Sequence, residues 1–244
     1  MEMRKFIKID THVHTSGVSR CAQHTFQQAI DQKIKEGYDG LIMTNHCQSW
    51  YYAPTEEEHK QFVQKVIDEY HSAVAYAKDK GFRVMLGLEV TITNPFYSDW
   101  LLFGVTEAFL KTSPILYQLS QRELFALCEK ENIFLVHAHP LRPTPFGEQY
   151  SVGERDFLRG VEINCSNGDL DKKDEIIEIA QEMGVVVTCG SDYHGRASYT
   201  PGAMIVPSWV ETSVDFARYL KETDETWLIM GDKELKVPNF SKKV

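Results

Sequence analysis

Short apolar runs alternate with amphipathic helical patterns along this chain of 244 residues. Most of these runs are continuous in Val, Ile, Leu, Met and Phe, which is typical of parallel strands buried on both faces. Capping boxes at Thr25 and Ser120 begin two helical patterns, of which the first ends at Gly37, and two others end at Gly81 and Gly184. The sequence therefore predicts strands at residues 7–9, 40–45, 83–90, 100–105, 133–136, 161–165 and 185–189, with a further strand at 203–206.

This alternation predicts an α/β fold in one domain that covers residues 1–244. A length of 244 residues with 43% hydrophobic residues is normal for a single α/β barrel. No repeat, low-complexity tract or linker divides the chain. An open doubly wound sheet is the alternative, but no G-x-G-x-x-G follows the first strand, so dinucleotide binding has no support. We therefore expect a barrel-like domain.

The charge and the cysteine content argue against several kinds of partner. The formal net charge is −9 and no tract is basic, which argues against nucleic acid. An acidic protein can still act on small anions when bound metal ions supply positive charge. The five cysteines form no C-x-x-C pair, the N-terminus lacks a signal-peptide pattern, and no apolar run approaches the ~18 residues of a membrane span. We expect a reduced, cytoplasmic protein without membrane attachment.

Histidines and carboxylates gather at the ends of the predicted strands. Residues two apart on a strand point to the same side, so His12 and His14 form a pair at the end of the first strand. Parallel barrels build active sites from several strand ends, and imidazole and carboxylate groups suit zinc, manganese or iron. One H-x-H pair is weak evidence for a metal, but recurrence at successive strand ends predicts a metal site. The residues at these ends are His12, His14, His46, Glu89, His137, His139, Asp192 and His194.

Five motifs, taken in order, resemble those of the PHP (polymerase and histidinol phosphatase) family and span nearly the whole chain. They are Asp10-Thr-His12-Val-His14, Thr44-Asn45-His46, Gly87-Leu88-Glu89, His139-Pro140 and Asp192-Tyr-His194. The resemblance implies a distorted (β/α)7 TIM-like barrel that carries two or three divalent metal ions (zinc, manganese or iron). It also implies an enzyme that hydrolyses phosphate esters.

The resemblance further implies how two of the metal positions are built. His12, His14, Glu89 and Asp192 would surround the first metal. Glu89 would bridge to a second metal, which also takes His139. His137 shares a strand with His139, but the family motif selects His139 as the ligand.

The third metal position and part of the second depart from the family pattern. His46 and His194 would hold the third metal. Many family members have a histidine where this chain has Asp99, which can still bind metal through its carboxylate. The family also has an aspartate or histidine a few residues after H-x-H. Cys21 falls at that position and His24 lies close by; we prefer His24 because an imidazole matches the usual ligand better.

Hydrolysis of a phosphate monoester requires charge neutralisation and a nucleophile, because the ester repels anions. Metal ions supply both when they bind phosphoryl oxygens and activate a water molecule as the nucleophile. Asp192, Glu89 and His194 are the candidate catalytic residues that the resemblance implies. Arginine forks suit phosphate oxygens, and three arginines near the candidate ligands are expected to bind the substrate: Arg20, Arg142 and Arg196.

The leading hypothesis is a phosphomonoesterase that acts on a small phosphorylated metabolite. A nuclease-like phosphodiesterase is the second hypothesis, which the absence of a basic tract weakens. A non-catalytic metal-binding barrel is the third, and the departures at Asp99 and Cys21 keep it open. The identity of the metal, the leaving group and the oligomeric state stay open at this point.

Overall fold

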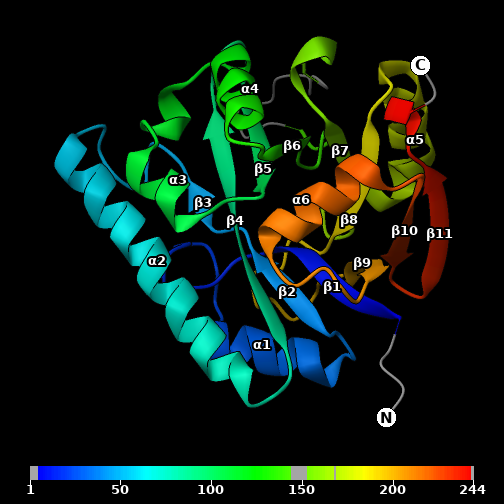
Figure 1. Cartoon of the computed structure of the whole chain (residues 1–244), viewed down its shortest axis with the longest axis horizontal. Coiled ribbons are helices and arrows are strands. Elements are labelled where there is room, and N and C mark those ends of the chain that lie inside the picture. Colours follow the sequence, from blue (N-terminus) through cyan, green and yellow to red (C-terminus); the bar gives the residue numbers. More distant parts are fainter. Residues whose placement is uncertain (1–4, 144–152, 168, 243–244) are drawn as a thin grey trace.

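The computed structural model describes residues 5–143, 153–167 and 169–242 of the chain (Figure 1). In these ranges the strands are β1 (Phe6–Val13), β2 (Gly40–Met43), β3 (His46–Cys47), β4 (Arg83–Ile92), β5 (Ser98–Phe103), β6 (Phe134–His137), β7 (Gly160–Asn164), β8 (Val186–Gly190), β9 (Gly202–Pro207), β10 (Glu225–Met230) and β11 (Lys233–Pro238). The α-helices are α1 (Phe26–Lys35), α2 (Glu56–Lys78), α3 (Glu107–Thr112), α4 (Gln121–Lys130), α5 (Lys173–Met183) and α6 (Ser213–Glu222). Short 3-10 helices are η1 (Leu116–Gln118), η2 (Arg155–Phe157), η3 (Asp169–Lys172) and η4 (Phe240–Lys242).

The strands form one sheet that curls into a nearly closed barrel. Hydrogen-bonded neighbours follow the order β1-β2-β4-β5-β6-β7-β8, and β9, β10 and β11 extend the sheet from the other edge of β1. The barrel closes where Val13, at the end of β1, forms a parallel bridge with Tyr193 beyond β8. Thr11 Oγ1 also donates to Cys189 O across this seam at 2.9 Å. The expectation of a barrel-like α/β fold is thereby confirmed.

The expectation that all the strands run parallel is wrong at two places. β5 runs antiparallel to both β4 and β6. Only residues 93–97 connect β4 to β5, and a parallel crossover needs a dozen residues or more. β9 runs antiparallel to β1 and is followed by the β10–β11 hairpin. The sequence of β11, KELKVP, is mostly polar, so the pattern of apolar runs did not predict it.

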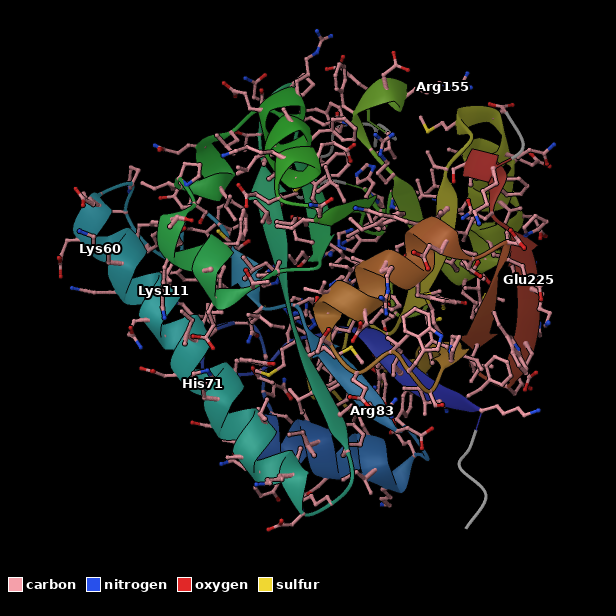
Figure 2. The ribbon with its side chains drawn as sticks, viewed as in Figure 1. Lys60, His71, Arg83, Lys111, Arg155 and Glu225 are labelled. Atoms are coloured by element: carbon pink, nitrogen blue, oxygen red, sulfur yellow. The ribbon has the colours of Figure 1, made fainter. Side chains whose placement is uncertain are left out.

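Helices lie around the strands (Figure 1), and each α-helix buries apolar residues on one side. The capping boxes predicted at Thr25 and Ser120 are confirmed at α1 and α4. Gly184 ends α5 with a φ of 66°, a left-handed conformation that glycine adopts without strain. Figure 2 labels His71 on α2, and its side chain is 57% exposed and lies 2.5 Å from Glu107 of α3. Within the part of the chain that the structure describes, no helix is both long and apolar enough to cross a membrane.

Candidate metal centre

The candidate ligands come from segments that meet at one rim of the barrel. Because β5 runs antiparallel to β4, the first residues of β5 lie beside the last residues of β4. Asp99 therefore pairs with Thr91. His137 does not join the ligands; its ring stacks on Trp100 with the ring centroids 4.5 Å apart. The residues at the rim are His12 in β1, His14 just after it, His46 in β3, Glu89 in β4, Asp99 in β5, His139 just after β6, and Asp192 and His194 after β8.

One group of donors is made by His12, His14 and Asp192, whose ligand atoms all lie within 4.8 Å of one another. His12 Nε2 and His14 Nε2 are 3.0 Å apart. Asp192 Oδ1 lies 3.4 Å from His12 Nε2 and 3.1 Å from His14 Nε2. Glu89 Oε1 also approaches His12 Nε2, at 3.3 Å. These are the four residues that the family resemblance assigns to the first metal.

A second group combines Glu89, Asp99 and His139. His139 Nε2 lies 3.0 Å from Glu89 Oε1 and 3.8 Å from Asp99 Oδ2. Thr91 Oγ1 donates to Asp99 Oδ1 at 2.5 Å and leaves the other oxygen facing the group. Because Glu89 contributes to both the first and the second group, its carboxylate is placed to bridge two ions.

A third group contains His14, His46 and His194. Cys21 lies next to this group, with its sulfur 3.1 Å from His194 Nε2. His24, the preferred candidate from the sequence, does not belong to this group: its Nδ1 lies 2.7 Å from the Tyr193 hydroxyl. The two residues are only three positions apart, and the course of the loop decides which of them faces the imidazoles.

Glu162 is a residue of the centre that the sequence did not reveal. This fully buried carboxylate lies 2.9 Å from His12 Nδ1 and accepts a hydrogen bond from the backbone N–H of His139 at 3.2 Å. A carboxylate only accepts, so His12 Nδ1 carries a proton and His12 Nε2 is the atom available to a metal. Gly190 makes room for this contact, because a Cβ there would lie 2.6 Å from His12 Cβ. The one signal in the sequence was an acidic residue inside the apolar strand Val161–Cys165.

A buried ion pair lies next to the metal centre and holds the backbone of two of its segments. Lys33 and Asp10 are both fully buried, with Lys33 Nζ 2.6 Å from Asp10 Oδ2. Asp10 Oδ1 accepts hydrogen bonds from the backbone N–H groups of His12 at 3.2 Å and Ser191 at 3.1 Å. Asp10 therefore holds the end of β1 next to the segment that leads into Asp192.

The charges of the centre shift the pKa values of its members in opposite directions. Burial favours a neutral Glu89, but His46 and His12 hold the pKa of that carboxyl well below its usual range. Burial also opposes charge on His12, yet Glu162, Asp192 and Glu89 raise its pKa well above 6.5. Despite its own burial, His46 has a pKa raised to about 10, chiefly by Glu89. The negative charge of the carboxylates is balanced here by protons on the imidazoles. Bound metal ions would displace these protons and supply the positive charge instead.

Several buried polar atoms point into the centre without a hydrogen bond to any described residue. They are Glu89 Oε2, His46 Nδ1 and Asp192 Oδ1. Buried carboxylate oxygens that accept no hydrogen bond are costly unless a cation offsets their charge. His139 and Asp192 also have positive φ angles, 32° and 51°, which are uncommon for residues with a side chain. The nitrogen and oxygen donors present therefore fit divalent metal ions such as zinc, manganese or iron.

A cavity of about 520 Å³ opens beside the ligand groups. Trp50, Tyr51 and Tyr97 form part of its wall, and Asp192 and His194 lie on its lining together with Asp99, His46 and Cys21. All three arginines that were expected to bind substrate also line it: Arg20, Arg142 and Arg196.

Comparison with known proteins finds similar structures but no similar sequences, because no family model and no curated protein matches the chain. A two-domain protein from Bacteroides vulgatus, containing a predicted PHP-like metal-dependent phosphoesterase, aligns with a TM-score of 0.62 and 16% identity over 94% of this chain and 66% of that one. A protein from Bifidobacterium adolescentis, described as a metal-dependent phosphoesterase, aligns with a TM-score of 0.54 and 16% identity over 78% of this chain and 88% of that one. A lesion-specific endonuclease from Pyrococcus furiosus aligns with a TM-score of 0.58 and 15% identity over 88% of this chain and 56% of that one.

These likenesses establish the fold. This chain spans slightly less than two thirds of the Bacteroides protein and just over half of the endonuclease. Its barrel is similar in fold to those of the Bacteroides and Bifidobacterium proteins, in agreement with the TIM-like barrel that the five motifs imply.

Proposed function

We propose that this chain is a metal-dependent hydrolase of phosphate esters that acts on a small phosphorylated metabolite. The observation that carries the proposal is the rim itself. Three overlapping groups of histidine and carboxylate donors, linked by the buried Glu89, border a cavity lined by three arginines. Such a site can neutralise a phosphoryl group from two sides, because cations bound by the donors and the guanidinium groups carry the same sign of charge.

The residues of the chain divide into ligands and substrate-binding groups. His12, His14, Glu89 and Asp192 would hold one ion, and Glu89, Asp99 and His139 a second. When bound, divalent ions would offset the phosphoryl charge and lower the pKa of a water molecule that acts as the nucleophile. Asp192, Glu89 and His194 are the proposed catalytic residues, of which Asp192 and His194 border the cavity directly.

The three arginines are not equally available to a substrate phosphate. Arg20 already donates to the backbone carbonyls of Trp50 at 3.4 Å and Tyr51 at 2.8 Å. Arg142 and Arg196 are exposed, and neither forms a salt bridge with another described residue. Their guanidinium groups are therefore the better candidates for the phosphate of the substrate, whereas Arg20 also stabilises the aromatic wall.

A phosphodiesterase acting on nucleic acid is the second candidate, favoured by the structural similarity to the Pyrococcus endonuclease. The net charge of −9 opposes it, because affinity for nucleic acid depends strongly on basic side chains that contact phosphates. A small substrate, which needs only the local positive charge of the cavity, is more compatible with this composition.

The test loads the purified protein separately with manganese, zinc or iron(II) and compares p-nitrophenyl phosphate, bis(p-nitrophenyl) phosphate and single-stranded DNA as substrates. We expect the monoester to be hydrolysed fastest. Asp192→Asn should lower kcat/KM by roughly 100-fold or more, equivalent to about 3 kcal/mol of transition-state stabilisation. His71→Gln, an exposed position on α2 that belongs to none of the donor groups, is the matched control and should be fully active.

Each alternative has its own outcome in this experiment. Faster cleavage of the diester or of DNA would favour the phosphodiesterase. Bound metal without hydrolysis of any of the three substrates would favour the non-catalytic barrel. Equal activity of Asp192→Asn and the unmodified protein would contradict the proposed site.

A further inference from the structure

We propose that Cys21 is a thiolate ligand of the metal position formed by His46 and His194, and that this position is a zinc site. The inference rests on the metal centre of the proposed function but not on its hydrolytic activity. It makes the centre chemically asymmetric, with a sulfur-containing position at one end and a carboxylate-rich position at the other.

The first argument is the direction of the His194 lone pair. His194 Nδ1 lies 2.9 Å from the backbone carbonyl oxygen of Asp192, an atom that only accepts. The proton of a neutral imidazole is therefore on Nδ1, and the lone pair is on Nε2. This lone pair faces the Cys21 sulfur at 3.1 Å. A thiolate and an imidazole nitrogen that face each other at this distance are placed to share a cation.

The second argument is that the loop holds the Cys21 sulfur in place. The Tyr51 hydroxyl donates to the sulfur at 3.2 Å and accepts from the backbone N–H of Cys21 at 3.4 Å. Two residues further on, the backbone N–H of Gln23 donates to the carbonyl oxygen of His194 at 2.8 Å. The loop is thus fastened to the segment that carries the histidine ligand. A hydrogen bond to the sulfur is also the kind of outer contact that orients a metal ligand.

The third argument is independent of the cysteine. His46 Nδ1 and Glu89 Oε2 approach to 2.7 Å, yet neither atom has a hydrogen bond of acceptable geometry among the described residues. Glu89 is fully buried, and its Oε2 lies beside His46 Nδ1 without a hydrogen bond. His14, His46 and His194 also bring their donor atoms within 4.8 Å of one another. Buried polar atoms without a hydrogen bond, beside a cluster of imidazoles, indicate a cation at this end of the centre.

The fourth argument is the chemistry of the ligands. Thiolate is a soft ligand that favours zinc, and imidazole also suits zinc, whereas carboxylates suit manganese and magnesium. The position of Cys21, His46 and His194 therefore favours zinc, with loss of the thiol proton to solvent on binding. The position of Glu89 and Asp99 has two carboxylates and only one imidazole, from His139, and therefore offers harder ligands that suit manganese. The two ends of the centre should consequently differ in metal preference.

Cobalt(II) provides a direct test, because thiolate-to-cobalt charge transfer absorbs in the near ultraviolet and nitrogen or oxygen ligands do not produce this band. The full chain is stripped of metal, reconstituted with cobalt(II), and compared with Cys21→Ser and Cys47→Ala. Cys47 is the matched control: it follows His46 directly, but its sulfur lies 3.3 Å from the Tyr52 hydroxyl and belongs to none of the donor groups. Zinc and manganese contents are measured in parallel by elemental analysis.

We expect the band in the unmodified protein and in Cys47→Ala, and its loss in Cys21→Ser. Zinc affinity at this position should fall by roughly 10- to 100-fold or more in Cys21→Ser, while the other ions are retained. Absence of the band from cobalt-loaded protein, or its persistence in Cys21→Ser, would overturn the inference. Hydrolysis without the band would refute only the cysteine ligand. The band without hydrolysis would refute only the proposed function.

Discussion

The ammonium of Lys33 is fully buried beneath the metal centre, 2.6 Å from Asp10 Oδ2. At an effective dielectric constant of about 20, two unit charges at this distance attract each other by about 6 kcal/mol. Part of that gain offsets the desolvation of both groups. Lys33→Met removes one partner and leaves a buried carboxylate, a change that typically costs about 3–5 kcal/mol. Ser191 and His12 still donate to Asp10, so we expect the lower half of this range.

Thermal unfolding followed by circular dichroism measures this cost. For a chain of this size, the expected cost of about 3–4 kcal/mol corresponds to a decrease in Tm of roughly 6–16 °C. The double variant Asp10→Asn/Lys33→Met should be more stable than the sum of the single effects predicts, by about 1–3 kcal/mol, because neither charge is then left alone. Lys80→Met is the matched control: its ion pair with Asp31 at 3.1 Å is exposed, and we expect Tm to change little.

Two results would refute the reasoning. If Lys33→Met unfolds at nearly the same temperature as the unmodified protein, the ion pair contributes little to the stability of the barrel. If the effects of the single variants at Lys33 and Asp10 simply add, the two charges do not act as a unit.

Three further predictions concern the metal centre. In the metal-free protein, His46 stabilises the fold fully below its ordinary pKa of 6.5, and this contribution is lost as the pH rises through about 10; urea unfolding from pH 6 to pH 10 should show the decrease, and a rise in stability would contradict it. Glu162→Gln keeps the shape of the side chain but weakens the support of His12, so metal affinity measured by calorimetry should fall by roughly 10- to 100-fold; an unchanged affinity would exclude Glu162 from the centre. His24→Gln should retain the full metal content by elemental analysis, since His24 contacts the Tyr193 hydroxyl; loss of one ion would show that His24 is a ligand after all.

Local patterns in the sequence predicted the class of fold and most of the rim. Apolar runs and capping boxes depend on neighbouring residues, so the strands at 40–45, 83–90 and 185–189 could be predicted without long-range information. The same holds for the pairing of His12 with His14, which follows from the two-residue period of a strand. The direction of β5 was predicted wrongly, although the short connection at 93–97 already argued against a parallel crossover.

Contacts between distant segments could not be predicted in this way. Glu162 reaches His12 across 150 positions of the chain, and nothing near either residue marks the other as its partner. Lys33 has an ordinary place in the sequence of α1, yet its side chain is buried against Asp10. Such partners are chosen when the barrel closes, because closure brings together side chains whose positions along the chain are unrelated.

The sequence by itself thus determined that strands end in histidines and carboxylates, since each strand and its final residues are adjacent along the chain. Only the tertiary structure decided how these ends combine. The bridge between Val13 and Tyr193 closes the barrel and brings Asp192 and His194 to His14. The same closure turns Cys21 toward His194 and His24 toward Tyr193, because the loop is fastened to the backbone of His194. Spacing along the chain could not distinguish these two neighbours, whereas the packed position of the loop does.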